Sequence, residues 1–187
     1  MRSARGGATS AVRIIAGRWR GRRVTVPAGT AIRPTPNRVR ETLFNCLQGH
    51  IEGASCLDLF AGTGALGIEA LSRGAAHVSF VERDRDAAAA IRAQLLGLGA
   101  QDDEFDVTPA AAERFVRSTQ QRFDIVFLDP PFALEVTEIL NLVWPHVKAG
   151  GLVYCEQALE RGLPPLPDGT WIKTGKAGAV CFGLARA

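Results

Sequence analysis

The sequence lacks long apolar runs and the residue patterns that usually mark metal or redox centres. No stretch approaches the 18 consecutive apolar residues of a membrane-spanning helix, and the polar, Arg-bearing first dozen residues lack the apolar segment of a secretory signal. The four cysteines show no C-x-x-C spacing, and the three histidines are far apart. These absences predict a soluble cytoplasmic protein with reduced cysteines and no metal site.

Acidic residues and lysines are scarce at the start of the chain. Residues 1–50 contain ten arginines, no lysine and one acid, Glu41, so they carry a net charge of +9, whereas the rest of the chain carries −6. A basic segment on an acidic body is typical of a polyanion-binding arm attached to a separate core. A general arginine bias is the plainer explanation, but it does not account for this clustering. We therefore favour nucleic acid as the partner.

Strand-like and helix-like segments alternate from residue 56 onward, which predicts an α/β fold with a parallel sheet covered by helices on both faces. The strands are expected at 56–60, 77–81, 105–107, 123–128 and 151–155, and the helices at 64–73, 84–98, 110–118 and 135–147. A closing hairpin is expected at 171–174 and 179–184, an upstream hairpin at 12–16 and 22–26, and a helix at 37–48. The chain is long enough for one substantial core, and we divide it into a basic arm, 1–36, and a body, 37–187.

A predicted strand runs into a glycine-rich turn and a helix between residues 58 and 67. Gly62, Gly64 and Gly67 satisfy G-x-G-x-x-G, and Glu82 follows at the end of the next predicted strand. Glycine lets a ligand approach the backbone, and an acid at that place can accept hydrogen bonds from both hydroxyls of a ribose. The pattern predicts a site for a nucleoside-containing cofactor.

Acids at the strand ends help to distinguish two such cofactors. A dinucleotide would place its pyrophosphate at the helix N-terminus, where Asp58 would repel it. S-adenosylmethionine has no phosphate, and Asp58 and Asp129 would attract its ammonium and sulfonium groups. Either acid could instead be only a turn or helix cap, so a nicotinamide-dependent oxidoreductase stays open as an alternative.

The segment Asp129-Pro130-Pro131-Phe132 directly follows the buried strand predicted at 123–128. Its two prolines remove two backbone N–H donors and fix φ near −65°. The Asp129 carboxylate and the neighbouring carbonyls are then left as acceptors, with an aromatic ring beside them. Such a site suits a planar group that carries an N–H₂, such as a nucleobase amine. A core aromatic is the plainer interpretation of Phe132.

These segments together resemble a known enzyme family. Residues 58–67 and Glu82 look like the first motif and the ribose-binding acid of S-adenosylmethionine-dependent methyltransferases. Asp129-Pro130-Pro131-Phe132 resembles the [D/N/S]-P-P-[Y/F/W] motif of those that methylate exocyclic amines of nucleobases. The upstream segments 13–17, 19–22, 33–35 and 38–45 are similar to bacterial 16S ribosomal RNA guanine-N2 methyltransferases of the RsmD type.

The resemblance implies a fold, an activity and a set of partners. The fold would be the Rossmann-like class I methyltransferase fold, with a mostly parallel seven-stranded sheet and a small N-terminal β-hairpin extension. The activity would be methyl transfer from S-adenosylmethionine to N2 of a guanine in 16S ribosomal RNA. The substrate would be the small ribosomal subunit or its assembly intermediate, and the enzyme a cytoplasmic monomer.

Site residues follow by position. The resemblance implies that the catalytic residues are Asp129, Pro130, Pro131 and Phe132. The residues expected to contact the cofactor are Asp58, Phe60, Ala61, Gly62, Thr63, Gly64, Gly67, Glu82, Arg83, Ala111, Ala112 and Asp129. Many relatives have Asp or Asn beside the adenine where this chain offers Ala111 and Ala112, so only backbone groups remain for that contact.

The RNA contacts are expected in the basic arm and just after it. The predicted set is Arg13, Arg18, Trp19, Arg20, Arg22, Arg23, Arg33, Thr35, Arg38 and Arg40. The hairpin arginines would bind phosphates, which positions the RNA without reading its sequence. Two roles are open for Trp19, stacking on an unpaired base or packing the hairpin onto the body. The last four members could reach either the substrate or the carboxylate of the cofactor.

The expected mechanism follows from the chemistry of the base. The guanine N2 lone pair is delocalised into the ring, and a stacked base is out of reach, so the base has to be extruded. Asp129 and the Pro130 carbonyl would accept the two N2 hydrogens and stabilise the developing positive charge, while Phe132 stacks on the base. Whether Asp129 also takes the proton stays open. The alternatives are an amino-methyltransferase for adenine or cytosine in RNA or DNA, and a non-enzymatic RNA-binding protein.

Overall fold

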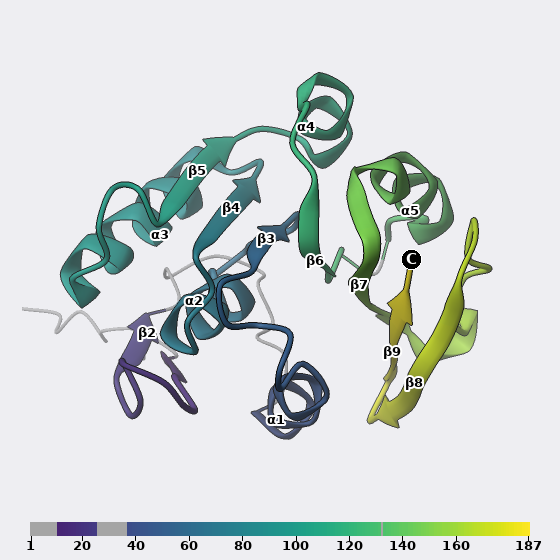
Figure 1. The fold of residues 1–187 in the computed structure, drawn as a ribbon, viewed down its shortest axis with the longest axis horizontal. Coiled ribbons are helices and arrows are strands. Elements are labelled where there is room, and N and C mark those ends of the chain that lie inside the picture. The colour runs from purple at the N-terminus through teal and green to yellow at the C-terminus, as the bar shows by residue number, and fades with distance from the viewer. Residues whose placement is uncertain (1–10, 26–36, 132) are drawn as a thin grey trace, which may run out of the picture.

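The structure is a computed structural model, which describes residues 11–25, 37–131 and 133–187. In these ranges seven strands form one sheet in the order β5-β4-β3-β6-β7-β9-β8, and β1 and β2 form a separate antiparallel pair (Figure 1). Strands β3 to β7 run parallel, and β9 is antiparallel to both β7 and β8. The mostly parallel seven-stranded sheet and both hairpins are therefore confirmed.

The elements alternate along the chain as the sequence predicts. The strands are β1 (Ala11–Arg13), β2 (Arg23–Thr25), β3 (Ser55–Asp58), β4 (His77–Glu82), β5 (Phe105–Pro109), β6 (Phe123–Leu128), β7 (Val147–Ala158), β8 (Thr170–Ala177) and β9 (Val180–Arg186). The helices are α1 (Asn37–Cys46), α2 (Ala65–Ser72), α3 (Arg85–Leu98), α4 (Ala112–Ser118) and α5 (Val136–Val143). Two 3₁₀ turns, η1 (Trp144–His146) and η2 (Leu159–Arg161), flank β7.

Most expected boundaries differ by up to three residues, and two elements differ by four at one end, each for a physical reason. The helix expected at 135–147 ends at Val143 and continues as the 3₁₀ turn η1, because Pro145 lacks the N–H of a regular helical turn. The strand expected at 151–155 extends over Val147–Ala158 because β9 pairs with its second half from Leu152 to Ala158. A partner strand of this kind is not visible in the local sequence.

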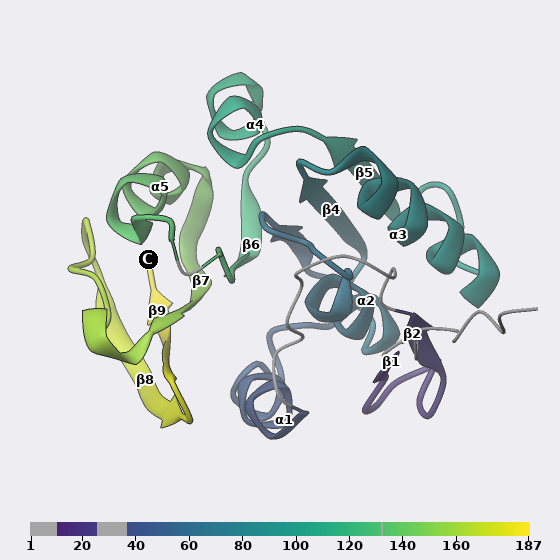
Figure 2. The same ribbon diagram turned by 180° about the vertical axis from the view of Figure 1, so that it is seen from behind.

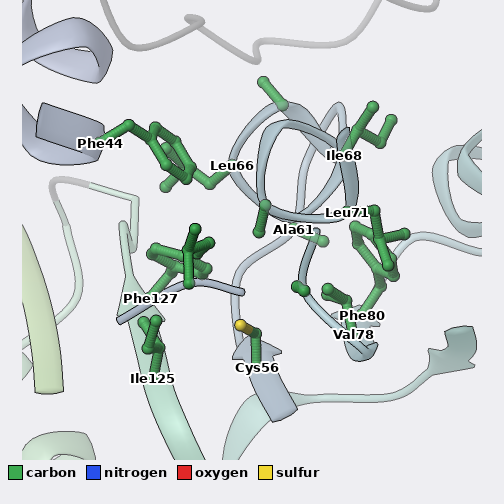
Figure 3. Packing of buried hydrophobic residues seen from close by; sticks show 14 of the residues in the cluster. Phe44, Cys56, Ala61, Leu66, Ile68, Leu71, Val78, Phe80, Ile125 and Phe127 are labelled. Carbon is green, nitrogen blue, oxygen red and sulfur yellow. The ribbon is translucent and has the colours of Figure 1, made fainter. Parts of the chain in front are cut away.

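The helices cover both faces of the sheet, as Figures 1 and 2 show. One core cluster lies under α1, α2 and α3 and includes Phe44, Ile68 and Phe127. Figure 3 shows Phe44 and Leu66 facing Phe127 and Ile125 across this layer. The second cluster lies under α4 and α5 on the opposite face. Alternate residues of each central strand enter the two clusters, as expected for strands buried on both faces.

The N-terminal hairpin packs into the same core as α1 and α2. Val12, Ile14, Trp19 and Val24 are buried members of the first cluster. The described part of the arm therefore lies against the body. In the ranges that the structure describes, no helix is long and apolar enough to cross a membrane.

Candidate active site

Three neighbouring parallel strands end at the same edge of the sheet, and each carries an acid there. The strand register pairs Asp58 with Phe80 of β4 and with Phe127 of β6. Glu82 and Asp129 therefore lie two residues beyond the level of Asp58, on strands spaced about 4.8 Å apart. Ligands of parallel sheets bind outside this carboxyl edge. The predicted cofactor acids and the first residue of the D-P-P-F segment are thus brought together.

The glycine-rich turn between β3 and α2 requires glycine for two different reasons. Gly62 and Gly64 have φ of 55° and 77°, in the left-handed region that side chains rarely adopt. Gly67 lies within α2, where a Cβ atom would collide with the ring of Phe80 on β4. The first two glycines shape the turn, and the third lets the helix pack closely on the sheet.

Glu82 orders the glycine turn in addition to the ribose contact predicted for it. Its carboxylate accepts hydrogen bonds from the Gly62 N–H at 2.8 Å and from the Asp84 N–H at 2.9 Å. The side chain is half-buried. This link between two loops was not foreseen, and the ribose contact stays a prediction.

Asp58 is buried beneath the turn, with 2% of its surface exposed. Its Oδ2 atom accepts the Gly67 N–H at 2.9 Å, so the side chain holds the first turn of α2. Burial raises the pKa of Asp58 to about 7, the Gly67 hydrogen bond opposes this rise, and the charges of Asp129 and Glu82 add to it. A cationic ligand would favour the ionised form of this carboxyl group.

The D-P-P-F segment leaves β6 at the centre of the edge. Asp129 is half-buried, Pro130 is buried and Pro131 is exposed. The Pro131 carbonyl accepts the Leu134 N–H at 2.8 Å, which closes a turn before α5. Phe132 lies outside the described residues, so its predicted stacking on a base stays a prediction.

The remaining predicted cofactor residues lie around this edge. The Ala61 N–H donates to the Val81 carbonyl at 3.0 Å, and the Ala110 N–H donates to the Glu82 carbonyl at 3.0 Å. The second bond brings the start of α4, and with it Ala111 and Ala112, beside the end of β4. Their exposure differs: Phe60 is half-buried, Thr63 and Ala112 are buried, and Arg83 and Ala111 are exposed.

Glu69 of α2 fastens the N-terminal hairpin to the body, a role that the sequence did not reveal. This fully buried carboxylate accepts the Ile15 N–H at 2.8 Å, the Ala16 N–H at 3.0 Å and the Arg73 Nε–H at 2.7 Å. Arg40 Nη1 lies 3.8 Å from its Oε2 atom. The available signal was an acid inside the otherwise apolar helix A-L-G-I-E-A-L-S.

Arg40 does not fit its predicted contact with RNA or cofactor. Only 1% of the residue is exposed, and its Nη2 atom donates to the Arg13 carbonyl and to Asn37 Oδ1, both at 2.7 Å. Burial lowers the pKa of Arg40, and the nearby Glu69 charge raises it. Because this guanidinium lies in the core, Arg40 leaves the predicted contact set.

Trp19 adopts the packing alternative. The residue is 5% exposed, and its backbone N–H donates to Ser72 Oγ at 3.0 Å. The Arg18 guanidinium lies 4.2 Å from the Trp19 ring centroid and also pairs with Glu104 at 2.7 Å. The indole is therefore buried in the core, and the Trp19 backbone attaches the hairpin to α2.

Six arginines of the predicted RNA-binding set are exposed, namely Arg13, Arg18, Arg20, Arg22, Arg23 and Arg38. Of these, Arg22 also donates to the Leu98 and Gly97 carbonyls at 3.1 Å and 2.8 Å, where α3 ends. Arg33 and Thr35 lie outside the described residues. Arg18 and Arg22 are thus exposed and also bonded to the body, Arg18 through Glu104 and Arg22 through the end of α3.

The chemistry of the edge suits a cationic ligand that carries a diol. Asp58, Glu82 and Asp129 offer carboxylate acceptors, and no described salt bridge places an Arg or Lys on Asp58. The positive-φ glycines keep side chains away from the turn. A pyrophosphate would meet negative charge here, whereas a sulfonium, an ammonium and ribose hydroxyls would meet acceptors.

Comparisons with known proteins agree with this arrangement. Residues 12–185 match the family model described as Conserved hypothetical protein 95. Ribosomal RNA small subunit methyltransferase D of Escherichia coli is 42% identical over 179 residues, which cover 92% of this chain and 88% of that protein. The protein of the same name from Haemophilus influenzae is 39% identical over 92% of each chain. The solved structure of yhhF from Escherichia coli has a TM-score of 0.86 and 38% identity, and covers 95% of this chain and 98% of that one.

Proposed function

This chain belongs to the family described as Conserved hypothetical protein 95 and is 39% and 42% identical to two ribosomal RNA small subunit methyltransferases D. We propose that it methylates ribosomal RNA of the small subunit with S-adenosylmethionine as the donor. The proposal rests on where the D-P-P segment and the glycine turn lie relative to each other. The D-P-P segment and the glycine turn leave adjacent parallel strands at one edge of the sheet. A site for an amine then lies directly beside a site for a methyl donor.

The acceptor that we propose is the exocyclic N2 amine of a guanine in 16S ribosomal RNA. Asp129 and the Pro130 carbonyl would accept its two hydrogens and hold the nitrogen toward the donor. The negative charge of Asp129 would stabilise the positive charge that develops on the nitrogen. Phe132 would stack on the base and keep the nitrogen in line with the methyl group.

S-adenosylmethionine supplies an electrophilic methyl group on a sulfonium when it is bound. Glu82 would hold the ribose, the 62–64 turn would lie against the nucleoside, and Asp58 would attract the positive groups. The backbone beside Ala111 and Ala112 would face the adenine. A nicotinamide dinucleotide is disfavoured because its pyrophosphate would lie near Asp58, whose burial already disfavours negative charge.

The exposed arginines of the arm would bind RNA phosphates. Arg20 and Arg23 lie on the N-terminal hairpin and Arg38 on the first turn of α1. We propose the small subunit or its assembly intermediate as the substrate, a monomer as the active form, and the cytoplasm as its location.

The deciding experiment is transfer from labelled S-adenosylmethionine to naked 16S RNA and to small subunits that lack the modification. The label should appear as N2-methylguanosine at one position. If the label appears on an adenine or cytosine amine, that base and not guanine is the methyl acceptor. Tight binding of NAD with no transfer to either RNA would overturn the proposed function.

A further inference from the structure

A buried acid on β7, Glu156, lies beside the reaction site and has no part in the function proposed so far. The register of β6 and β7 pairs Leu128 with Cys155. The next residue along the chain is Asp129, directly after β6, on one side and Glu156, within β7, on the other. The two acids are therefore neighbours at the carboxyl ends of adjacent strands.

The alternation of side chains directs both acids to the same face of the sheet. Phe127 and Tyr154 belong to the core cluster under α1 and α2, whereas Leu128 and Cys155 belong to the cluster on the opposite face. Glu156 follows the direction of Tyr154, whose O–H donates to Glu156 Oε2 at 2.8 Å. Continuing the alternation one residue past Leu128 places Asp129 on that face as well.

Glu156 has little solvent and no described cation to balance a charge. It is 4% exposed, and none of the salt bridges in the described ranges includes it. The titratable groups around it are Asp129 beyond β6, Tyr154 and Cys155 on β7, and Cys181 on β9. Burial, and then the charge of Asp129, raise the pKa of Glu156 to about 7, while the Tyr154 hydrogen bond opposes this rise.

We propose that Glu156 is the charge-setting partner of Asp129, so that the two carboxyl groups act as a pair on the amine that is methylated. Carboxyl groups so close together ionise in two steps that belong to the pair. The first step provides the acceptor at Asp129. The second places another negative charge beside the amine and makes Asp129 a stronger acceptor. This inference rests on the proposed function.

The reaction gives the second charge a purpose. As the N2 lone pair forms a bond to the methyl carbon, the carbon–sulfur bond breaks, the sulfonium becomes a neutral thioether, and the nitrogen becomes positive. The nitrogen then loses one proton, which the carboxyl pair accepts and later releases to water. The doubly ionised pair stabilises the positive nitrogen more strongly than one carboxylate does.

A role in folding alone makes a different prediction. For the fold, Glu156 needs only to accept the Tyr154 O–H, and a glutamine of nearly the same shape can do that. Glu156→Gln therefore keeps the hydrogen bond and removes only the charge. Tyr154→Phe does the opposite, since it removes the bond that stabilises the ionised Glu156 and should raise the second ionisation of the pair.

The test is the pH profile of kcat/KM for RNA at saturating S-adenosylmethionine. The acid limb should move down by about one pH unit or more in Glu156→Gln, because the second ionisation of the pair is lost and only that of Asp129 remains. It should move up in Tyr154→Phe. Asp124→Asn is the matched control, because Asp124 lies near the other end of β6 and contacts Ser55 and Lys148. Its limb should coincide with that of the wild type.

A second measurement does not depend on activity. Difference infrared titration of the free protein should show protonated carboxyl groups that ionise near neutral pH. Glu156→Gln should remove part of this signal, and Asp129→Asn should move part of it to lower pH because a like charge is gone.

The outcomes separate the two proposals. A wild-type protein that transfers no methyl group overturns the proposed function. An active wild type with coincident acid limbs in Glu156→Gln and Tyr154→Phe overturns the pairing. If Glu156→Gln does not fold, an unmoved acid limb in Tyr154→Phe together with an infrared signal unchanged by Asp129→Asn does the same.

Discussion

Two sets of buried acids in this chain differ in the hydrogen bonds and opposite charges that surround them. Glu69, under the N-terminal hairpin, is fully buried and is met by two backbone N–H groups and by Arg73, with Arg40 close by. Asp58 and Glu156, at the carboxyl edge of the sheet, are almost as buried, but each accepts only one described hydrogen bond from a neutral donor. Within the described residues, the Glu69 carboxylate that fastens the arm is compensated by opposite charge, whereas the Asp58 and Glu156 carboxyl groups are not.

The difference separates a structural acid from a functional one. A buried charge is costly unless hydrogen bonds and opposite charges satisfy it. The surroundings of Glu69 meet that condition without any ligand. At the edge of the sheet the pKa of Asp58 and of Glu156 rises to about 7, with burial as the largest cause and the charge of Asp129 adding to it. We interpret the edge as a place where ligand and substrate complete the compensation.

The largest effect is expected at Asp129. Asp129→Ala should lower the rate of methyl transfer by at least about 10²–10³-fold, because it removes the charge next to the amine. S-adenosylmethionine binding should stay largely intact and the melting temperature should change little. Single-turnover transfer and calorimetric binding measure the two properties. Near-normal turnover would remove Asp129 from the reaction.

Substitution of the structural acid, Glu69, should lower the stability of the fold, whereas substitution of Asp129 should lower the rate of methyl transfer. Glu69→Gln should lower the free energy of unfolding by about 3–5 kcal/mol, because it leaves the buried Arg40 without its charge partner. Urea unfolding measures this loss. Asp102→Asn, which breaks the exposed Arg92–Asp102 pair, is the control and should cost less than about 1 kcal/mol. Equal losses in the two variants would contradict the contrast.

The exposed arginines of the arm should affect RNA binding alone. Removing residues 1–25 is a poor test because it also removes Trp19, which is buried in the core. Arg20→Glu with Arg23→Glu should instead weaken RNA binding about tenfold and reduce its salt dependence by about one unit per lost phosphate contact. Arg122→Glu, exposed just before β6 at the opposite edge of the sheet, is the control. Unchanged RNA affinity in the arm variant would leave the hairpin with a structural role only.

The last effect concerns stability without ligand and is small at any one step of pH. The raised pKa of Asp58 and Glu156 means that the folded protein holds protons between about pH 4 and about pH 7 that the unfolded chain has lost. The stability that these groups contribute is present below this window and is lost as pH rises through it, by at most about 1.4 kcal/mol per pH unit for each acid. Thermal unfolding should show a flatter slope in Asp58→Asn and in Glu156→Gln. Slopes identical to the wild type would place both groups at ordinary pKa values.

Local patterns in the sequence were enough to predict the sheet and its edge. Strand β6 begins and ends where its apolar run does, at Phe123 and Leu128, and the glycine turn, Glu82 and Asp129 lie where strand and helix alternation puts them. These features depend on neighbours in the sequence. The glycine turn, the helix after it and the acid at each strand end are each determined by a few neighbouring residues.

The features that were missed depend on contacts between distant segments. Glu69 meets Ile15 and Ala16 across more than 50 residues, and Glu156 becomes a neighbour of Asp129 only through the register of β6 with β7. Arg40 was also missed because of contacts between distant segments. It lies in a basic segment, which predicts phosphate binding, but packing buries its side chain. Sequence patterns show which charges are present, and packing decides which of them are compensated.

The most direct test of this account is the affinity for S-adenosylmethionine as a function of pH. Calorimetry in two buffers of different ionisation enthalpy gives both the affinity and the protons released. Between about pH 5.5 and about pH 7 the affinity should rise about tenfold with release of protons, and Asp58→Asn should abolish most of that rise. An affinity that is constant over this range, with no proton exchange, would contradict the claim that the acids of the edge are compensated by the ligand.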